Sequence, residues 1–478
     1  MQLQMLIENN LMRKQTDHLN ITKRGNTAIL LLATQGLIGC GGGSNSVSYQ
    51  IQTLLGTAGN DLLVSSTDYG IIDALAGNDR IYGTEQAEVI LPGFGSDEVF
   101  ASGGADTITV VSFNDEIDGG TGSDTLSVEF ANTNIEVIIS LADGLIYNAQ
   151  AAAIDRSTLS SIENVEVNSD NSVTVFGTDT DNQITTASGN DTIHLGGGSN
   201  VVNSGAGSDH IYIAGSGNTA NLGSGNDFVT TSSFESALNG GTGIDTLILS
   251  PNSFETPLTI NLELQTFTST AASGSINIAN IEQYEFSETN TTTVHGTEAA
   301  EAFILSSGAG IIYGGGGGDT FTGSALSDKF VFSQKYENSD TITNFTTSGA
   351  NLDIIAFNQA NFGLSGSTYQ EISLFSGGRK EITADVGFIF VQDQIGFSSE
   401  TALSTALSGI NGITTSGSSL GSVLCMWWQP NSSSAVMSVI TDFTPNNNSF
   451  DQIENIAVFE NLTIGDYSNF SNSNIEVL

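Results

Sequence analysis

Basic residues are scarce in this chain. Its 478 residues include 10 Lys and Arg against 52 Asp and Glu, which gives a formal net charge of -42. A surface this acidic repels phosphate, whereas nucleic-acid binding needs Lys and Arg to displace counterions. We therefore exclude a nucleic-acid partner and expect multivalent cations to bind instead.

Cysteine and histidine are also rare, which excludes several kinds of site. Cys40 and Cys425 are the only thiols, so neither a disulfide framework nor a four-Cys zinc site is possible. The four His residues form no H-E-x-x-H zinc motif. Gly417-Ser-Ser-Leu-Gly421 matches the G-x-S-x-G pattern of α/β hydrolases, but those enzymes need a later His and His295 is the last one. We therefore expect no enzyme activity.

Proline contributes 5 residues, whereas glycine contributes 55 and hydrophobic residues make up 38% of the chain. The glycine content is well above the usual share of about 7%. The apolar content is sufficient for a packed core. The glycines therefore predict tight turns in ordered structure rather than a flexible chain.

The first 39 residues have the pattern of an export signal. Basic pairs at 13–14 and 23–24 precede an apolar run over 27–39, which is too short to span a bilayer. The run ends in Leu37-Ile-Gly-Cys40, which resembles the lipobox of bacterial lipoproteins and implies lipidation of Cys40. We expect a signal peptide over 1–39 and a tether over 40–55, with the lipid as the only membrane contact. The alternative is an ordinary secretory signal.

A nine-residue period runs through three segments, 56–127, 177–248 and 296–331. Most of its positions are acidic, with Asn or Ser at alternate positions of the second run, and an apolar residue follows each position by two. Glycines precede the acid in most repeats, as in Gly119-Gly-Thr-Gly-Ser-Asp-Thr-Leu-Ser127. This repeat resembles the calcium-binding nonapeptide of the RTX, or haemolysin-type, family, which implies calcium-binding parallel β-rolls. The predicted metal ligands are the acidic members of the runs: Asp61, Asp79, Glu88, Asp97, Asp106, Asp115, Asp124, Asp191, Asp209, Asp227, Asp245, Glu301, Asp319 and Asp328.

The same arrangement follows from the physics of the repeat. A glycine turn and a short extended segment, with its middle residue inward, form half a coil, so two nonapeptides make one full coil. Stacked coils form two parallel sheets, and the acids align along the two edges. Stacked carboxylates repel one another unless a hard cation with 6 to 8 oxygen ligands lies between them, which favours Ca²⁺ over the smaller Mg²⁺.

Two features limit the predicted sites. Val110-Val-Ser-Phe113 occupies the glycine positions ahead of Asp115, which departs from the family pattern and weakens that site. In the second run one edge is acidic, and the other carries Asn182, Asn200, Asn218 and Ser236. We expect strong calcium binding on the acidic edge and an Asn hydrogen-bond ladder on the other.

The runs are joined by segments that we expect to be β-rich connectors, over 128–176 and 249–295. The nonapeptide runs that precede them align with each other end to end. The two connectors share an Ile-Glu pair, in Ser161-Ile-Glu-Asn and in Asn280-Ile-Glu-Gln. We interpret them as architecture rather than as ligand grooves. Residues 332–478 are predicted to form a β-rich capping domain, with Cys425-Met-Trp-Trp428 as a buried strand rather than an exposed contact.

The sequence thus predicts an all-β chain of parallel β-rolls, joined by β-rich connectors and closed by a β-rich C-terminal domain. We expect an exported, calcium-stabilised extracellular or cell-surface protein, such as an outer-membrane lipoprotein, with a structural, adhesive or coat role. One alternative is a secreted hydrolase with an unrecognised site in 332–478. Another is a type I secreted RTX protein, against which the lipobox argues.

Overall fold

The computed structural model describes most of the chain from residue 52 onward. The described residues are 52–477 except 132–134, 151–154, 233–234, 250–256, 270–272, 288–290, 334–338, 358, 363–367, 373–385, 392–397, 400–401, 404–421, 431, 433 and 442–451. The predicted signal peptide, Cys40 and most of the predicted tether lie outside this set. Within the described residues, no helix is both long and apolar enough to cross a membrane.

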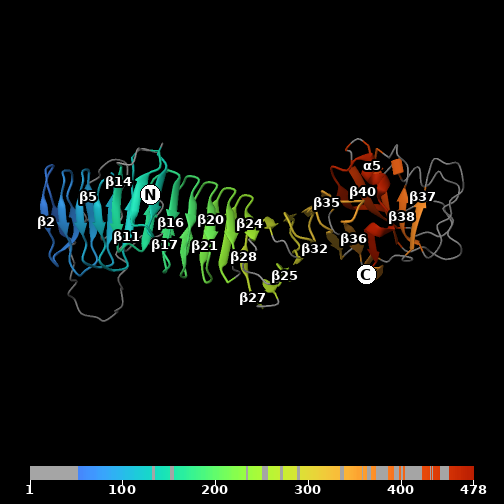
Figure 1. Ribbon diagram of the computed structural model, residues 1–478, viewed down its shortest axis with the longest axis horizontal. Coiled ribbons are helices and arrows are strands. Elements are labelled where there is room, and N and C mark those ends of the chain that lie inside the picture. Colours follow the sequence, from blue (N-terminus) through green and yellow to red (C-terminus); the bar gives the residue numbers. More distant parts are fainter. Residues whose placement is uncertain are drawn as a thin grey trace, which may run out of the picture. The chain divides into compact units, whose positions relative to one another are not determined.

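The first roll consists of stacked coils, each with one strand on either face (Figure 1). Its strands pair in parallel with the strands one coil further on, so Leu63 lies beside Ile81 and Ile81 beside Val99. The predicted coil of two nonapeptides is therefore confirmed. One face comprises β1 (Gln52–Leu55), β3 (Tyr69–Asp73), β5 (Val89–Gly93), β8 (Thr107–Val110) and β11 (Thr125–Val128), and the other comprises β2 (Leu62–Val64), β4 (Arg80–Tyr82), β6 (Glu98–Phe100) and β9 (Glu116–Asp118).

The stack begins earlier than the sequence indicated. β1 lies at the end of the predicted tether, yet it pairs in parallel with β3. Gln52–Leu55 carries no nonapeptide acid, so the nine-residue period could not identify it as a strand. Among the described residues, the stack therefore already includes Gln52–Leu55, which lie in the range predicted as a tether.

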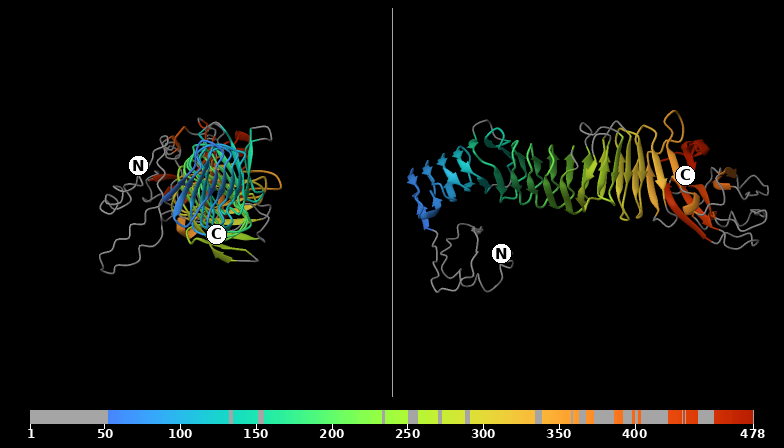
Figure 2. Two further views of the ribbon diagram at one scale, coloured as in Figure 1. Left: turned by 90° about the vertical axis from the view of Figure 1, so that its left-hand side faces the viewer. Right: turned by 90° about the horizontal axis from the view of Figure 1, so that it is seen from below.

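The second roll repeats this design and continues both sheets. One face comprises β17 (Gln183–Thr185), β19 (Val201–Asn203), β21 (Thr219–Ser224) and β23 (Ala237–Thr242), and the other comprises β18 (Thr192–His194), β20 (His210–Ile213), β22 (Phe228–Thr231) and β24 (Thr246–Leu249). Ile193, Ile211 and Val229 lie directly beside one another and are fully buried. Seen end-on, the strands of the two rolls superpose in projection (Figure 2, left).

The first connector is built into both sheets, whereas the second continues one sheet and ends the other. In the first, β12 (Val137–Ser140), β13 (Leu145–Asn148) and β14 (Arg156–Ser160) form an antiparallel insertion between β9 and β16 (Val173–Phe176), while β15 (Asn164–Val167) continues the other face. The second has a similar order with one strand more: β25 (Leu258–Asn261), β26 (Thr266–Thr268), β27 (Ser273–Ser275), β28 (Asn277–Ala279) and β29 (Gln283–Phe286). Two strands of this connector, β27 and β28, take the place of β14. Its β28 and β29 pair with β23 and β24 of the preceding roll.

The third roll passes directly into the C-terminal domain. Its strands are β30 (Thr292–His295), β31 (Ala302–Leu305), β32 (Gly310–Tyr313), β33 (Thr320–Thr322), β34 (Lys329–Phe332), β35 (Asp340–Thr343) and β36 (Ile354–Phe357). The strands β37 (Thr368–Ile372), β38 (Val386–Val391), β39 (Ser422–Gln429), β40 (Ser434–Thr441), β41 (Gln452–Phe459) and β42 (Ile475–Val477) follow. β41 pairs with β35 and β42 with β36, so the chain end covers both sheets of the roll.

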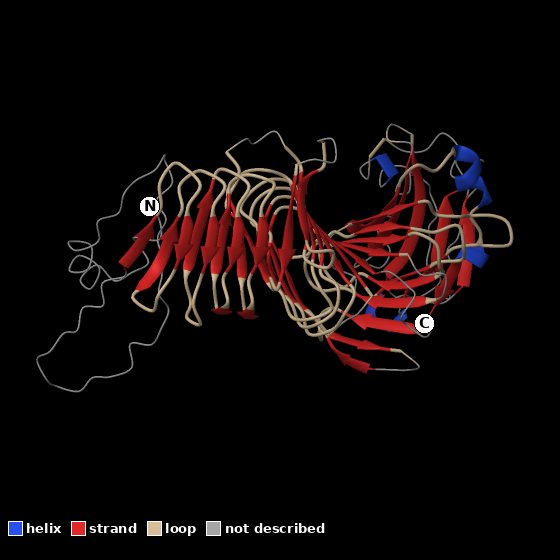
Figure 3. Ribbon diagram, turned by 60° about the vertical axis from the view of Figure 1, so that its left-hand side comes forward, coloured by secondary structure: helices blue, strands red, loops and turns tan. Residues whose placement is uncertain are grey.

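The helices α3 (Gln359–Phe362) and α5 (Ile464–Asn469) and the 3-10 turn η1 (Asn472–Asn474) lie in the C-terminal part (Figure 3). The prediction that Cys425–Trp428 is a buried strand is confirmed, because these residues form part of β39 and are at most 6% exposed. Trp427 donates its indole N–H to Ser438 at 2.9 Å. Burial raises the pKa of the Cys425 thiol to about 12, so this residue stays a protonated packing group.

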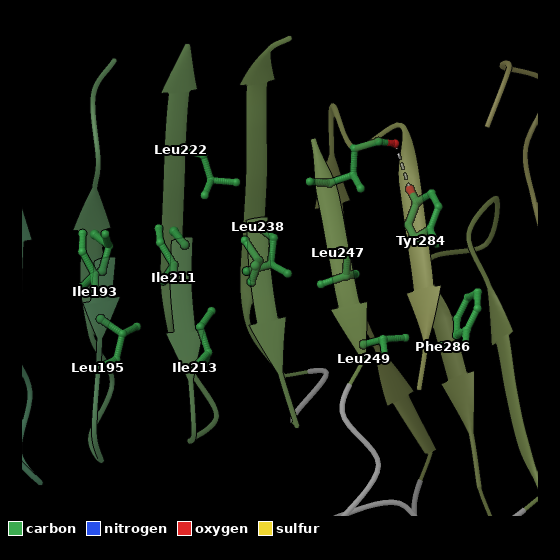
Figure 4. Packing of buried hydrophobic residues seen from close by; sticks show 14 of the residues in the cluster. Ile193, Leu195, Ile211, Ile213, Leu222, Leu238, Leu247, Leu249, Tyr284 and Phe286 are labelled. Carbon is green, nitrogen blue, oxygen red and sulfur yellow. Dashed lines mark hydrogen bonds between the residues drawn. The ribbon is translucent and has the colours of Figure 1, made fainter. Parts of the chain in front are cut away.

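Inward side chains stack into apolar ladders between the two sheets (Figure 4). Ile193, Ile211 and Leu247 face Leu222 and Leu238 of the opposite sheet and are at most 5% exposed. Full burial of one such side chain contributes about 1.5–3 kcal/mol. This contribution is repeated in every coil. The aliphatic residue two positions after the acid therefore supplies the core of the roll.

Aromatic rings form a second ladder on the outer face of the second roll. His194 lies between Phe176 and Tyr212, with ring centroids 4.7 Å and 4.3 Å apart and planes nearly parallel. His210 stacks on Tyr212 at 4.1 Å. Partial burial lowers the pKa of both His residues. Both His residues therefore act as stacking groups of this ladder.

Candidate calcium-binding columns

The acids of the rolls align into columns along the coil edges, as the period of nine predicts. Each column member lies one coil, or two nonapeptides, from the next. We define the first column as Asp61, Asp79, Asp97 and Asp115, the second column as Glu88, Asp106 and Asp124, and the third column as Asp191, Asp209, Asp227 and Asp245.

A repeated hydrogen bond holds each column together. One carboxylate oxygen of each acid after the first accepts the backbone N–H of the acid one coil earlier. In the third column, Oδ1 of Asp209 accepts the N–H of Asp191 at 2.9 Å, and Oδ1 of Asp227 accepts the N–H of Asp209 at 2.8 Å. The first and second columns have the same bonds at 2.7–3.1 Å. The fold thus fixes where one oxygen of each carboxylate lies.

The second oxygen of most column members is buried without a partner. The Oδ2 atoms concerned belong to Asp79, Asp97, Asp106, Asp124, Asp191, Asp209, Asp227 and Asp245. These side chains are at most 2% exposed. A buried carboxylate oxygen that lacks a hydrogen bond or counter-ion is costly. Eight such atoms in regular columns therefore indicate a missing ligand of positive charge.

Burial raises the pKa of several column acids, and neighbouring carboxylates add to the effect at some of them. The pKa of Asp106 rises to about 7 for these two reasons. Desolvation by burial is also the main cause for Asp209 and Asp227, whose pKa rises to about 6. The ion pairs among the described residues, Arg80 with Glu98 and Lys329 with Glu476, involve no column member. Protein cations of the described chain therefore do not offset the charge of the columns.

Glycines let the loops of successive coils approach closely at these edges. Gly225, two residues before Asp227, has φ of 138°, and a Cβ there would lie 1.6 Å from the carbonyl oxygen of Gly207. Any side chain would therefore push the coils apart. The loops bring carbonyl oxygens and carboxylates together, which is the oxygen-rich donor set that Ca²⁺ accepts.

No three acidic, His or Cys side chains gather around one point in the described part of the chain. The donors that each gap offers are the carboxylates of successive coils and the turn carbonyls. These residues fit calcium as the group implied by the repeat. Bound there, the ion would supply positive charge to the unpartnered Oδ2 atoms of adjacent coils.

Four of the predicted ligands differ, because their carboxylates are already hydrogen-bonded within their own loop. Both carboxylate oxygens of Glu301 accept hydrogen bonds from Thr297, one from its N–H at 2.9 Å and one from its hydroxyl at 2.6 Å. Asp61, Glu88 and Asp328 have equivalent bonds from Thr57, Thr84 and Ser324. Each of these four acids has a Thr or Ser four residues before it, which our sequence analysis missed, but Ser102 stands at the same place before Asp106, whose Oδ2 has no partner.

Asp115 and Asp319 belong to neither class. The N–H of Asp115 donates to Ser157 of the connector at 3.0 Å instead of to another acid, so the first column ends there. Phe113 of the irregular loop stacks on Phe130 with centroids 4.5 Å apart. Oδ1 of Asp319 accepts the N–H of Glu301 at 2.9 Å, and burial raises the pKa of Asp319 to about 7.

The opposite edge of the second roll forms the expected amide ladder. Oδ1 of Asn200 accepts the N–H of Asn182 at 2.8 Å, and Oδ1 of Asn218 accepts the N–H of Asn200 at 2.9 Å. The Asn200 amide also donates to Gly197 at 2.8 Å. These side chains therefore reproduce the column hydrogen bond without charge and without an orphaned oxygen.

The columns extend beyond the nonapeptides, which the sequence analysis did not predict. Glu163 and Glu282 of the connectors accept the N–H groups of Asp124 and Asp245, at 2.8 Å and 2.9 Å. Beyond the last nonapeptide of the third roll, Asp340 and Asp353 accept the N–H groups of Asp319 and Asp328 in the same way. The Glu residues belong to the Ile-Glu segments that the sequence analysis assigned to architecture alone.

Comparison with known proteins agrees with this geometry. The RTX calcium-binding nonapeptide repeat matches four segments, 70–99, 100–132, 176–211 and 295–329. A search of curated protein sequences finds no match. The third column continues beyond the matched segments to Asp227 and Asp245 with the same hydrogen bonds. This all-β chain of parallel rolls therefore carries RTX (haemolysin-type) calcium-binding repeats.

Proposed function

We propose that this chain is an extracellular or cell-surface protein that folds upon binding calcium and has a structural, adhesive or coat role. The observation that carries the proposal is the set of eight buried carboxylate oxygens without partners, aligned in three columns. Calcium placed between the coils supplies the positive charge that the columns lack. Its binding free energy then becomes folding free energy, because the unfolded chain has no such columns.

Extracellular calcium modules typically bind with dissociation constants of about 10⁻⁴–10⁻³ M. A roll of that affinity folds where calcium is abundant, which couples folding to export. The net charge of -42 also opposes compaction in the absence of cations. Export through the N-terminal signal and attachment through Cys40 complete the proposal. Mass spectrometry of membrane-derived protein is expected to find an acylated N-terminal Cys40, and an unmodified N-terminus elsewhere would contradict the anchor.

The test of the calcium proposal is a titration of the purified mature chain, followed by circular dichroism. Strand signal and thermal midpoint are expected to rise with Ca²⁺ and to rise much less with equal Mg²⁺. A strand signal that is already complete in EDTA would contradict the mechanism.

A secreted hydrolase remains the competing proposal. A groove of about 690 Å³ lies at the start of the C-terminal domain, lined by hydroxyl and amide side chains such as Ser306 and Asn344, by apolar side chains such as Phe345, and by two carboxylates. Its Asp466 carboxylate accepts hydrogen bonds from Thr463, which lower its pKa and cap α5. Asp466 is therefore occupied structurally, and Glu460 is the other carboxylate that lines the groove. A single remaining carboxylate does not favour the two-carboxylate hydrolysis of glycosides. Turnover abolished by substitutions in 332–478 would reverse this preference.

A further inference from the structure

The first two rolls end in the same arrangement of connector and acid. Oε2 of Glu163 accepts the N–H of Asp124 at 2.8 Å, and Oε2 of Glu282 accepts the N–H of Asp245 at 2.9 Å. Inside a column, this bond is made by the acid of the next coil. Each connector Glu therefore occupies the place of the next column member, although the chain between the two bonded residues is about twice as long as one coil.

Each connector also resembles the next coil of a roll in the position of one backbone carbonyl. A Cβ built on Gly119 would lie 2.1 Å from the carbonyl oxygen of Ser161 and 2.7 Å from Oδ2 of Asp124. Within the first roll, Gly83 has the same neighbours, the carbonyl of Ala101 at 2.4 Å and a carboxylate oxygen of Glu88 at 3.0 Å. The connector thus presents a carbonyl where the next coil would present one.

The second connector reproduces this geometry with different residues. A Cβ on Gly240 would lie 1.9 Å from the carbonyl oxygen of Asn280 and 2.5 Å from Oδ2 of Asp245. Ser161 and Asn280 both adopt left-handed backbone conformations, with φ of 53° and 52°, which few residues other than glycine adopt. Two connectors of different sequence therefore hold the same unfavourable conformation at the residue that supplies the carbonyl.

Each of the two junctions also holds a carboxylate oxygen without a partner. Oδ2 of Asp124 and Oδ2 of Asp245 have no hydrogen-bond partner, and both side chains are 0% exposed. The end of the third roll is different, because Asp353 accepts the N–H of Asp328 through Oδ1 and the N–H of Thr346 through Oδ2. The two connector junctions therefore combine an orphaned carboxylate oxygen, a second carboxylate and a carbonyl, whereas this third end does not.

We propose that each connector completes an additional calcium site at its junction with the preceding roll, built by Asp124 and Glu163 in the first and by Asp245 and Glu282 in the second. Two carboxylates and a carbonyl form a hard-oxygen donor set of the kind that Ca²⁺ prefers. The inference rests on calcium binding by the rolls themselves. The connectors then do more than link the rolls, since calcium at the junction ties each roll to the segment that follows it.

The test counts the calcium ions bound by the full mature chain and by the double variant Glu163→Gln/Glu282→Gln. Gln retains an oxygen that can accept the N–H of Asp124 or Asp245 but removes the charge. Equilibrium dialysis with elemental analysis is expected to find two fewer bound ions in the double variant at limiting free calcium, with the same circular dichroism in saturating calcium. Glu166→Gln, an exposed acid of β15 in the same connector, is the matched control and is expected to lose none.

An unchanged ion count in the double variant would overturn the junction sites while leaving the rolls as calcium sites. A wild-type chain that binds no calcium would instead refute the proposed function. If the double variant does not fold, each single variant is measured and is expected to lose one ion. Full ion counts in both single variants would refute the proposal equally.

Discussion

Substitution of Asp209 separates the structural role of a column acid from its role in binding a cation. Asp209→Ala removes the Oδ1 that accepts the N–H of Asp191. Asn200→Ala removes the Oδ1 that accepts the N–H of Asn182 in the amide ladder. Each variant leaves one buried N–H unsatisfied, at a cost of about 1–3 kcal/mol. In chelator, the two variants are therefore expected to lose similar stability.

Calcium should distinguish the two variants. Asp209 borders two gaps of the third column, one toward Asp191 and one toward Asp227. An ion present at 100 times its dissociation constant adds about 2.7 kcal/mol to the stability of the state that binds it, so loss of two ions removes roughly 5 kcal/mol. Asn200→Ala should keep the full increment from calcium. Asp209→Asn, which keeps an acceptor and removes the charge, should be at least as stable as the wild type in chelator, because burial disfavours the ionised Asp209, and should lose the increment.

The assay is urea unfolding followed by circular dichroism, in EDTA and in saturating calcium, for the wild type and the three variants. The quantity compared is the difference in free energy of unfolding between the two conditions. An equal calcium increment in Asp209→Asn and the wild type would refute the reasoning. So would an equal loss of that increment in Asn200→Ala and Asp209→Ala.

Three further predictions follow from burial and loop geometry. Column acids have pKa values of about 6–7 in the folded rolls and 3.8 in the unfolded chain, so in EDTA their contribution to stability is complete below about pH 4 and is lost as the pH rises through 6–7. The thermal midpoint in EDTA should therefore be higher at pH 5 than at pH 8. Calcium should reverse this order. Gly225→Ala should lower the free energy of unfolding by at least ~1–3 kcal/mol from its backbone conformation alone. Gly215→Ala, whose Cβ would meet nothing closer than 3.5 Å, should cost less in the same urea assay. Equal losses would contradict the close approach of the coils. Phe330→Ala should lower the free energy of unfolding by about 3–5 kcal/mol, because the ring is fully buried. Phe94→Ala, at a side chain that is 64% exposed, should change it by no more than about 0.5 kcal/mol. A small loss for Phe330→Ala would argue against its place in the core.

Much of the fold follows from the period of nine residues alone. The glycine turn, the acid and the inward apolar residue all lie within one nonapeptide, so the repeat carries its own local instructions. The register of Leu63 with Ile81, and of Ile193 with Ile211, two repeats apart in each case, was therefore predictable. The contrast between the third column and its amide ladder was predictable too, because Asp and Asn differ in charge but share the acceptor that the ladder needs.

Contacts between segments that share no sequence period could be identified only from the tertiary structure. Glu163 meets Asp124 across an antiparallel insertion of irregular length, so no spacing in the sequence relates the two residues. Asp106 and Glu301 both follow a hydroxyl residue by four positions, yet Asp106 keeps an orphaned oxygen whereas Thr297 caps Glu301, so only the tertiary structure distinguishes them. The sequence by itself determined the coils, the columns and their charge. The tertiary structure decided which carboxylates still lack a partner and where the columns end, because burial and hydrogen bonding are set by neighbours distant in the chain.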